Sequence, residues 1–143
     1  MEYKTNIPVF EAEGTNYEIG FAIGSKAKSQ VLTCIQSYKD QFEAFVGLPW
    51  DKAKKLAQQY KPVIAEYNHD YIDEMQGIAD GAGVEFDDIL LLNCRSEVVL
   101  RNAEDATPDG CTAIAATPEV TRDGGTLIGQ NWDWKPTQRD AMI

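Results

Sequence analysis

The chain has 143 residues with a formal net charge of −10, and 43% of them are hydrophobic, which is enough for a domain with a buried core. A surface with this much negative charge repels phosphate backbones and anionic lipids. We therefore expect neither nucleic acid nor a membrane as a partner. The three cysteines are widely spaced and odd in number, which favours a reducing, cytoplasmic location over a disulfide framework. A single histidine and no Cys-x-x-Cys pair argue against a metal site.

The first part of the chain predicts a short strand followed by a long helix. Residues 7–13 alternate as in a strand, and the T-N-Y-E motif at 15–18 has the spacing of a capping box. Apolar residues then recur at steps of three and four over 19–46, which predicts one amphipathic helix. Because Gly20 and Gly24 lie one turn apart, we expect another element to pack closely against that face.

Further helices are predicted up to residue 102. Asp51 can start a helix that Pro62 should interrupt, and a third helical stretch over 68–79 stops at D-G-A-G. Asp87 or Asp88 can then cap a very apolar segment, I-L-L-L-N-C-R-S-E-V-V-L, which is typical of a buried helix.

The last part of the chain predicts a β-hairpin. Residues 103–110 are a loop, and two short strand-like runs within 111–134 flank the turn R-D-G-G. The predicted fold class is therefore α+β, mostly helical over 1–102 with a hairpin over 111–134. A two-stranded hairpin is only marginally stable and leaves its edges open, so we expect a longer protein or a second chain to complete the sheet.

Cys111 occupies a chemically suggestive position directly after Gly110. Glycine lets the backbone bend and leaves its own carbonyl uncrowded. The thiol can attack that carbonyl, which shifts the acyl group from nitrogen to sulfur, and hydrolysis of the thioester then frees Cys111 as a new N-terminus. Its α-amino group, with an ordinary pKa of about 8, can serve as the base for its own thiol.

The returning strand supplies a partner for Cys111. The turn places Asp133 almost beside it, since paired strands lie about 5 Å apart, and Asp133 can orient the new amino group. Asn131 shares the face of Asp133, whereas Trp132 and Trp134 point to the other face. Spacing alone leaves open the alternative that Cys111 is a small hydrophobic residue at the start of a strand.

Four blocks of sequence resemble the acyl-coenzyme A:6-aminopenicillanic acid acyltransferase (isopenicillin N acyltransferase) family of N-terminal-nucleophile (Ntn) hydrolases. They are E-I-G-F-A-I-G-S-K-A at 18–27, M-Q-G-I-A-D-G-A at 75–82, L-L-N-C-R-S-E at 91–97, and D-G-C-T-A at 109–113 with G-Q-N-W-D-W at 129–134. Members of this family are made as one precursor and are cut before the cysteine. The resemblance implies an αββα Ntn-hydrolase fold in the parent protein.

The resemblance assigns a role to each matching residue. It implies cleavage between Gly110 and Cys111, with Cys111 as the nucleophile and Asp133 beside the amino group of the nucleophile. Residues 1–110 then correspond to a helical α-subunit-like region, and 111–143 correspond to the start of a β-subunit-like region. Because the family's oxyanion-hole residues lie later in its chain, we expect the 143 residues alone to be inactive.

Other residues are supporting candidates. The related bile-salt hydrolases usually carry arginine three positions before the aspartate, whereas this chain has Gln130, which is similar to the acyltransferase branch. Asn131 is a second candidate beside Asp133. Arg95 and Glu97 have the pattern of a structural polar network, and in the family they would lie near the cleavage junction and could steer processing.

The implied partners are a small-molecule acyl donor, an amine or water as acceptor, and the remainder of the β subunit. Acyl-CoA as a co-substrate is implied by the resemblance alone, and no metal or redox cofactor is implied. Two alternatives stay open: a non-catalytic helical binding module or inactive fragment, and a cysteine hydrolase assisted by His69. Otherwise His69 is expected at the surface near a helix start, and Cys34 and Cys94 are expected to be packing residues.

Overall fold

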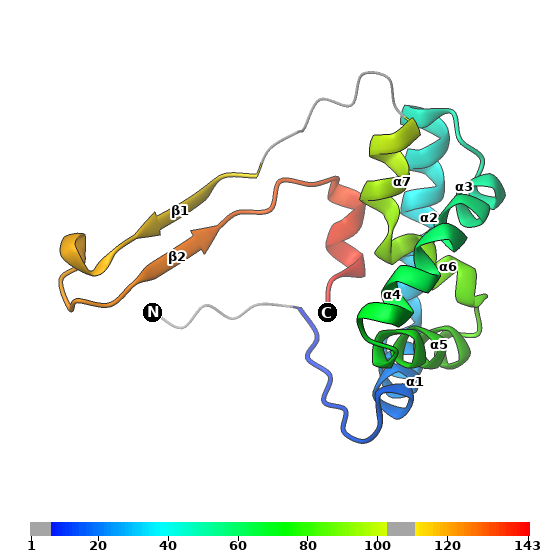
Figure 1. The fold of residues 1–143 in the computed structure, drawn as a ribbon, viewed down its shortest axis with the longest axis horizontal. Coiled ribbons are helices and arrows are strands. Elements are labelled where there is room, and N and C mark those ends of the chain that lie inside the picture. Colours follow the sequence, from blue (N-terminus) through cyan, green and yellow to red (C-terminus); the bar gives the residue numbers. More distant parts are fainter. Residues whose placement is uncertain (1–6, 103–110) are drawn as a thin grey trace. The chain divides into compact units, whose positions relative to one another are not determined.

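The computed structural model describes residues 7–102 and 111–143, which divide into two units (Figure 1). The first unit combines Met1–Ala106 with Thr137–Ile143 and contains helices α1 to α7 (residues 16–102), whereas the second, Thr107–Pro136, contains the hairpin. In the part of the chain that the structure describes, no helix has the length and apolar character needed to cross a membrane.

The helical unit confirms the predicted helical character up to residue 102. Its elements are α1 (Asn16–Lys26), α2 (Lys28–Gln41), a π-helical turn η1 (Phe42–Val46), α3 (Trp50–Ala57), a 3₁₀ turn η2 (Gln58–Tyr60), α4 (Lys61–Tyr67), α5 (Asp70–Ala82), α6 (Phe86–Asn93), α7 (Arg95–Asn102) and a 3₁₀ helix η4 (Pro136–Ala141). The capping box at Thr15 and Glu18 is present, and its hydrogen bonds from Thr15 lower the pKa of Glu18. The helix before Pro62 is interrupted as predicted, and Gly83 ends α5 in the left-handed conformation.

Several predicted boundaries are wrong. Residues 7–13 form no strand, and the predicted long helix is divided at Ala27 into α1 and α2. The apolar segment is likewise divided at Cys94 into α6 and α7, and its cap is Glu85, with Asp88 completing a capping box three residues later. Ala27 and Cys94 are buried, and they have neither the backbone freedom of glycine nor the fixed φ of proline. Packing therefore decides these two breaks, and periodicity cannot reveal them.

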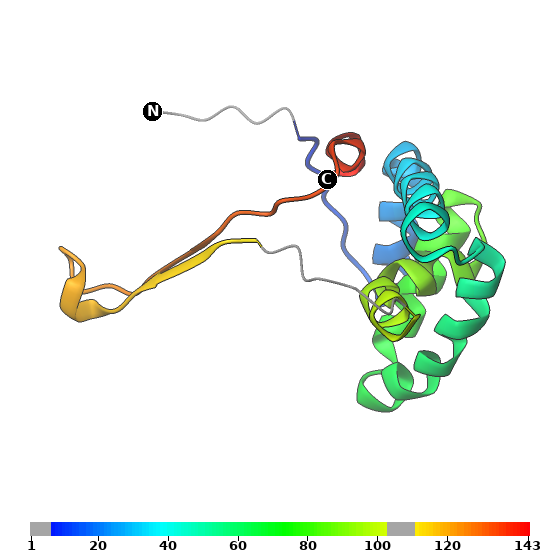
Figure 2. The ribbon, with the colours of Figure 1, turned by 90° about the horizontal axis from the view of Figure 1, so that it is seen from above.

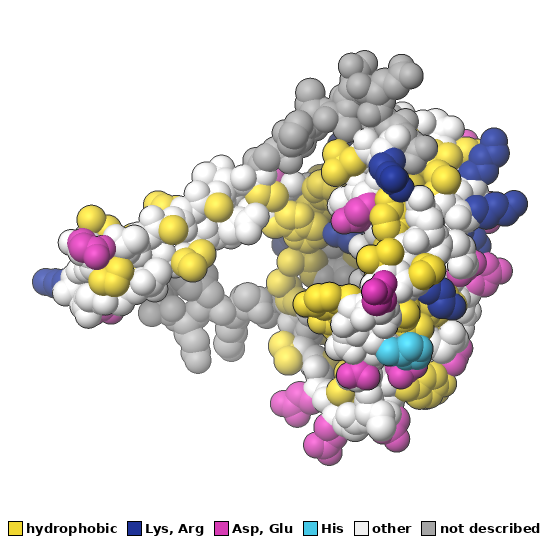
Figure 3. Space-filling model, in the orientation of Figure 1, with side chains coloured by type: hydrophobic (Ala, Val, Ile, Leu, Met, Phe, Trp, Pro, Cys, Tyr) yellow, Lys and Arg dark blue, Asp and Glu magenta, His cyan; other side chains and the backbone are white. Residues whose placement is uncertain are grey.

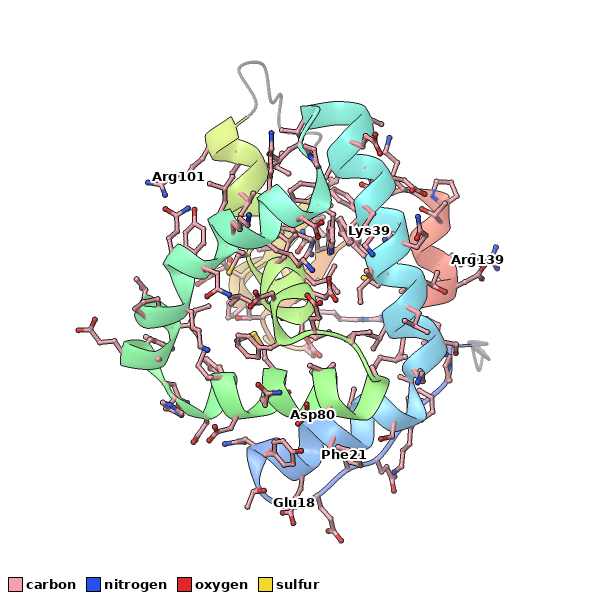
Figure 4. All side chains as sticks on the ribbon, turned by 90° about the vertical axis from the view of Figure 1, so that its right-hand side faces the viewer. Glu18, Phe21, Lys39, Asp80, Arg101 and Arg139 are labelled. Carbon is pink, nitrogen blue, oxygen red and sulfur yellow. The ribbon has the colours of Figure 1, made fainter. Side chains whose placement is uncertain are left out.

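Four glycines bring α1 and α5 into backbone contact, as predicted for the glycine face of the first helix (Figure 4). A Cβ atom added at Gly20 or Gly24 would lie 2.1 or 2.3 Å from a main-chain oxygen of α5. The same holds in reverse at Gly77 and Gly81, which meet main-chain oxygens of α1 at 2.1 and 2.3 Å. The two helices can therefore approach only because all four positions lack a side chain.

We expect Gly77→Ala to lower the free energy of unfolding of the helical unit by about 2 kcal/mol. Alanine improves helix propensity by about 1 kcal/mol, but its methyl group collides with the carbonyl of Tyr17, and this overpacking outweighs the gain. Urea unfolding followed by circular dichroism measures the change. Ser29→Ala on the exposed face of α2 is the control, and equal stability of the two variants would contradict the packing.

The core of the helical unit lies where α2, α3, α5, α6 and α7 meet. Its fully buried side chains include Phe42, Leu90, Leu91 and Val98. The indole Nε1 of Trp50 donates a 2.7 Å hydrogen bond to the buried carboxylate of Asp88, so the polar atoms of this pair are satisfied inside the core.

The hairpin unit has the predicted topology. Strands β1 (Ala113–Ala116) and β2 (Leu127–Gln130) are antiparallel, with Ala113 opposite Gln130 and Ala116 opposite Leu127, and they run side by side in both ribbon views (Figures 1 and 2). The connection contains a 3₁₀ turn, η3 (Pro118–Val120), and a turn at Gly124, whose φ is 70°. Hydrophobic side chains are visible along the hairpin surface (Figure 3), and Ile128 is 81% exposed.

Candidate active site

The hairpin brings Cys111 and Asp133 together. Asp133 lies just beyond β2, and its main-chain N–H points at the thiol of Cys111, with 3.4 Å between the nitrogen and Sγ. Cys111 is half-buried and has no disulfide partner, whereas Asp133 is exposed. The predicted proximity of these two residues is therefore present in the structure, although it arises through the main chain of Asp133.

Asn131 connects the two strands next to this pair. Its main-chain N–H donates to the carbonyl oxygen of Thr112 at 3.1 Å, and its side-chain Oδ1 accepts the N–H of Thr112 at 2.7 Å. Its Nδ2 donates to Oδ1 of Asp133 at 2.8 Å. Asn131 thus shares the face of Asp133, as the alternation of the strand predicts.

The indole rings of Trp132 and Trp134 stack on one another, with 6.0 Å between centroids and 13° between planes. Both side chains are about half exposed, at 51% and 44%. Gln130 is also exposed, at the end of β2. Gly110, the other half of the predicted cleavage site, and the 103–110 loop lie outside the described residues.

Sequence reasoning missed the main-chain groups of the site. The main-chain N–H of Asp133 and the main-chain N–H and carbonyl of Thr112 make hydrogen bonds around Cys111, and any residue other than proline could supply a main-chain donor. A residue pattern therefore carries no signal for them. The strand register is the only feature that could have pointed to these groups. The last observed pair is Ala113 with Gln130, and Thr112 and Asn131 are the next residue on each strand.

Arg95 and Glu97 belong to the helical unit. Arg95 donates through Nε to the hydroxyl of Tyr38 at 2.8 Å and through Nη1 to the carbonyl of Leu92 at 2.6 Å, and its guanidinium lies over the ring of Tyr38. Arg95 therefore has the structural polar role that its apolar surroundings predict. Glu97 is exposed at the start of α7. A role for Arg95 or Glu97 in cleavage of the precursor remains a prediction.

The other thiols and the histidine have the local settings expected of them. Cys94 is buried in the helical core, and burial together with the charge of Glu97 raises the pKa of its thiol to about 11. Burial also raises the pKa of Cys34, whose Sγ lies 3.6 Å from the side-chain oxygen of Gln138. His69 is exposed at the start of α5, with its Nδ1 3.5 Å from a carboxylate oxygen of Asp73.

Several curated proteins match nearly the whole chain, and two of them have names that state an activity. The acyl-coenzyme A:6-aminopenicillanic-acid-acyltransferase 40 kDa form of Emericella nidulans is 32% identical over 139 residues, which cover 92% of this chain and 35% of that protein. The chain belongs to the acyl-coenzyme A:6-aminopenicillanic acid acyltransferase family. A second member, the beta-alanyl-dopamine/carcinine hydrolase of Drosophila melanogaster, is 32% identical over 136 residues, covering 89% of this chain and 33% of its own length.

The chain spans about a third of the length of these two relatives. No protein-family model matches it. By their names, one of these relatives of the acyltransferase family transfers an acyl group and the other is a hydrolase. Both relatives are therefore named as enzymes.

Proposed function

We propose that the full-length protein is an acyltransferase or amide hydrolase whose nucleophile is Cys111 and which activates itself by cleavage at the Gly110–Cys111 bond. The observation that carries the proposal is the 3.4 Å contact between the Cys111 thiol and the main-chain nitrogen of Asp133. Both residues lie in segments, 109–113 and 129–134, whose sequence resembles the family. The αββα Ntn fold, with the hairpin as part of a larger sheet, is part of this proposal.

Cleavage starts with attack of Cys111 Sγ on the carbonyl carbon of Gly110. The C–N bond to Cys111 breaks, its nitrogen takes up a proton, and the acyl group of Gly110 becomes a thioester on sulfur. Water then hydrolyses the thioester, which releases the carboxyl group of Gly110 and restores the thiol. The products are a new C-terminus at Gly110 and a free α-amino group on Cys111, a group with an ordinary pKa near 8.

Turnover uses the same thiol with the new amine as its base. The α-amino group of Cys111 accepts the thiol proton, and the sulfur attacks the carbonyl carbon of the acyl donor. The leaving amine or thiol departs with the proton, and an acceptor amine or water then attacks the thioester and restores Cys111. Asp133 holds the α-amino group in place, which matters because a base must lie within hydrogen-bond reach of the proton it takes.

The proposed donors are small molecules with an amide or thioester bond. An acyl-CoA is a candidate because the Emericella relative is named for one, and an N-acyl amine is a candidate because the Drosophila relative is named as the hydrolase of two such compounds. Gln130 favours the acyltransferase branch over bile-salt chemistry, and a cytoplasmic location is part of the same proposal. The oxyanion-hole donors lie outside these 143 residues, so the chain alone should show negligible turnover.

The test is processing of the protein in a form that has the length of its relatives. We expect two fragments, with N-terminal sequencing of the larger one reading C-T-A-I-A-A from Cys111. Mass spectrometry of the smaller fragment should place its C-terminus at Gly110. The 143-residue chain is the control and should keep this bond intact, because the parts that strain and polarise it are missing. A fragment that begins elsewhere, or full activity of the uncut protein, would refute the proposal.

A further inference from the structure

We propose that Asn131 is a positioning residue that locks the carboxylate of Asp133 to the backbone beside the nucleophile. The inference rests on the proposed function and adds a residue to it. Asn131 touches neither the thiol nor a substrate in the described structure, so its effect must pass through Asp133 and Thr112. Two hydrogen bonds join Asn131, just after β2, to Thr112, just before β1, and a third joins its side chain to Asp133.

The side chain of Asn131 takes the place of a main-chain group in the strand ladder. By extension of the observed register, Asn131 lies opposite Thr112, one step beyond the pair Ala113 and Gln130. Residues that form a hydrogen-bonded antiparallel pair exchange both main-chain N–H groups and carbonyls. Here the N–H of Asn131 reaches the Thr112 carbonyl, but the N–H of Thr112 donates to the side-chain Oδ1 of Asn131.

The other end of the same amide fixes Asp133. Nδ2 of Asn131 donates to Oδ1 of Asp133 at 2.8 Å, which is a charge-assisted hydrogen bond. A flipped amide would put its oxygen against the carboxylate and its NH₂ group against the N–H of Thr112, so only the observed orientation satisfies both partners. A residue with one acceptor and one donor at fixed separation is required, and asparagine provides both.

These contacts form a continuous path around the nucleophile. Thr112 donates to Asn131, the side chain of Asn131 donates to Asp133, and the main-chain N–H of Asp133 points at Cys111 Sγ. Loss of the amide frees the Asp133 side chain to rotate in solvent, since it is exposed. Correct placement of Asp133 beside the α-amine of Cys111 therefore depends on Asn131.

The test compares Asn131→Asp and Asn131→Ala in the full-length protein. Aspartate keeps the size and the acceptor for Thr112 but cannot donate to Asp133, whereas alanine loses both contacts. We expect kcat to fall tenfold or more in both variants, with KM and melting temperature close to parental, because a misplaced acid–base partner slows chemistry rather than binding. Hydrogen exchange at the Thr112 amide should accelerate clearly in Asn131→Ala and little in Asn131→Asp.

Gln36→Glu is the matched control. It makes the same amide-to-acid change beside a carboxylate, since Nε2 of Gln36 donates to Oδ1 of Asp40 at 2.8 Å on the exposed face of α2. It should leave kcat unchanged. Parental kcat in Asn131→Ala, or a fall that only follows the loss of folded protein, would overturn the inference. Activity in Cys111→Ala would instead overturn the proposed function. Hydrogen exchange at the Thr112 amide would still decide whether the Asn131 side chain is hydrogen-bonded to that amide.

Discussion

Cys111→Ala in the full-length protein is expected to abolish both cleavage at Gly110 and acyl turnover. Alanine has no nucleophile for the Gly110 carbonyl, so the precursor stays in one piece, and without cleavage no α-amine is freed. Gel electrophoresis follows processing, and initial rates with a thioester or an N-acyl amine follow turnover. We expect a single uncut band and a rate equal to that of buffer, with a melting temperature close to parental.

The two other cysteines provide matched controls for this variant. Cys94→Ala and Cys34→Ala should cost roughly 0.5–3 kcal/mol of stability through lost packing, while processing and the rate per folded molecule stay parental. The pKa of both thiols is raised, so neither is poised to act as a thiolate. Turnover in Cys111→Ala at the level of these controls would show that the nucleophile lies elsewhere.

Asp133→Asn should lower turnover by on the order of a hundredfold, the usual scale for the loss of a positioned acid–base partner. The amide keeps the size of the side chain, and the main-chain N–H that points at the thiol is unaffected. Stability should therefore change little. Initial rates and thermal melting of the processed variant, measured in parallel, separate the effect on chemistry from the effect on folding.

A purely structural role for this pair predicts the opposite pattern. If Cys111 were only a small residue at the start of a strand, Cys111→Ala and Asp133→Asn would shift the melting temperature, and activity would fall only with the folded fraction. Parental processing and turnover in Asp133→Asn would mean that the contact between Cys111 and Asp133 is incidental to the hairpin.

Local sequence signals predicted those features that depend on a few neighbouring residues. The capping box at Thr15 and the left-handed end of α5 at Gly83 follow from side-chain oxygens and from the freedom of glycine. The hairpin follows from two apolar runs around a glycine turn, and the proximity of Cys111 and Asp133 follows from its approximate register. In each case the determining residues belong to one helix end or to one hairpin.

The remaining features depend on residues that are distant in sequence. Nothing local marks Ala27 or Cys94 as the end of a helix, and both are buried where packing sets the backbone. The alternation over 7–13 indicates a strand, but a strand also needs a partner, and none of the residues within 7–102 and 111–143 pairs with it. The Asn131 side chain accepts the N–H of Thr112 in place of a main-chain carbonyl. This could not be predicted either, because it depends on the backbone geometry at the end of the two paired strands.

The most direct measurement is the mass of the peptide that begins at Cys111, taken from processed protein quenched with acid during turnover. The proposed mechanism predicts an added acyl mass on this peptide, removable with neutral hydroxylamine as expected for a thioester, and no added mass on peptides that contain Cys34 or Cys94. An acyl group found on any residue other than Cys111 would contradict it.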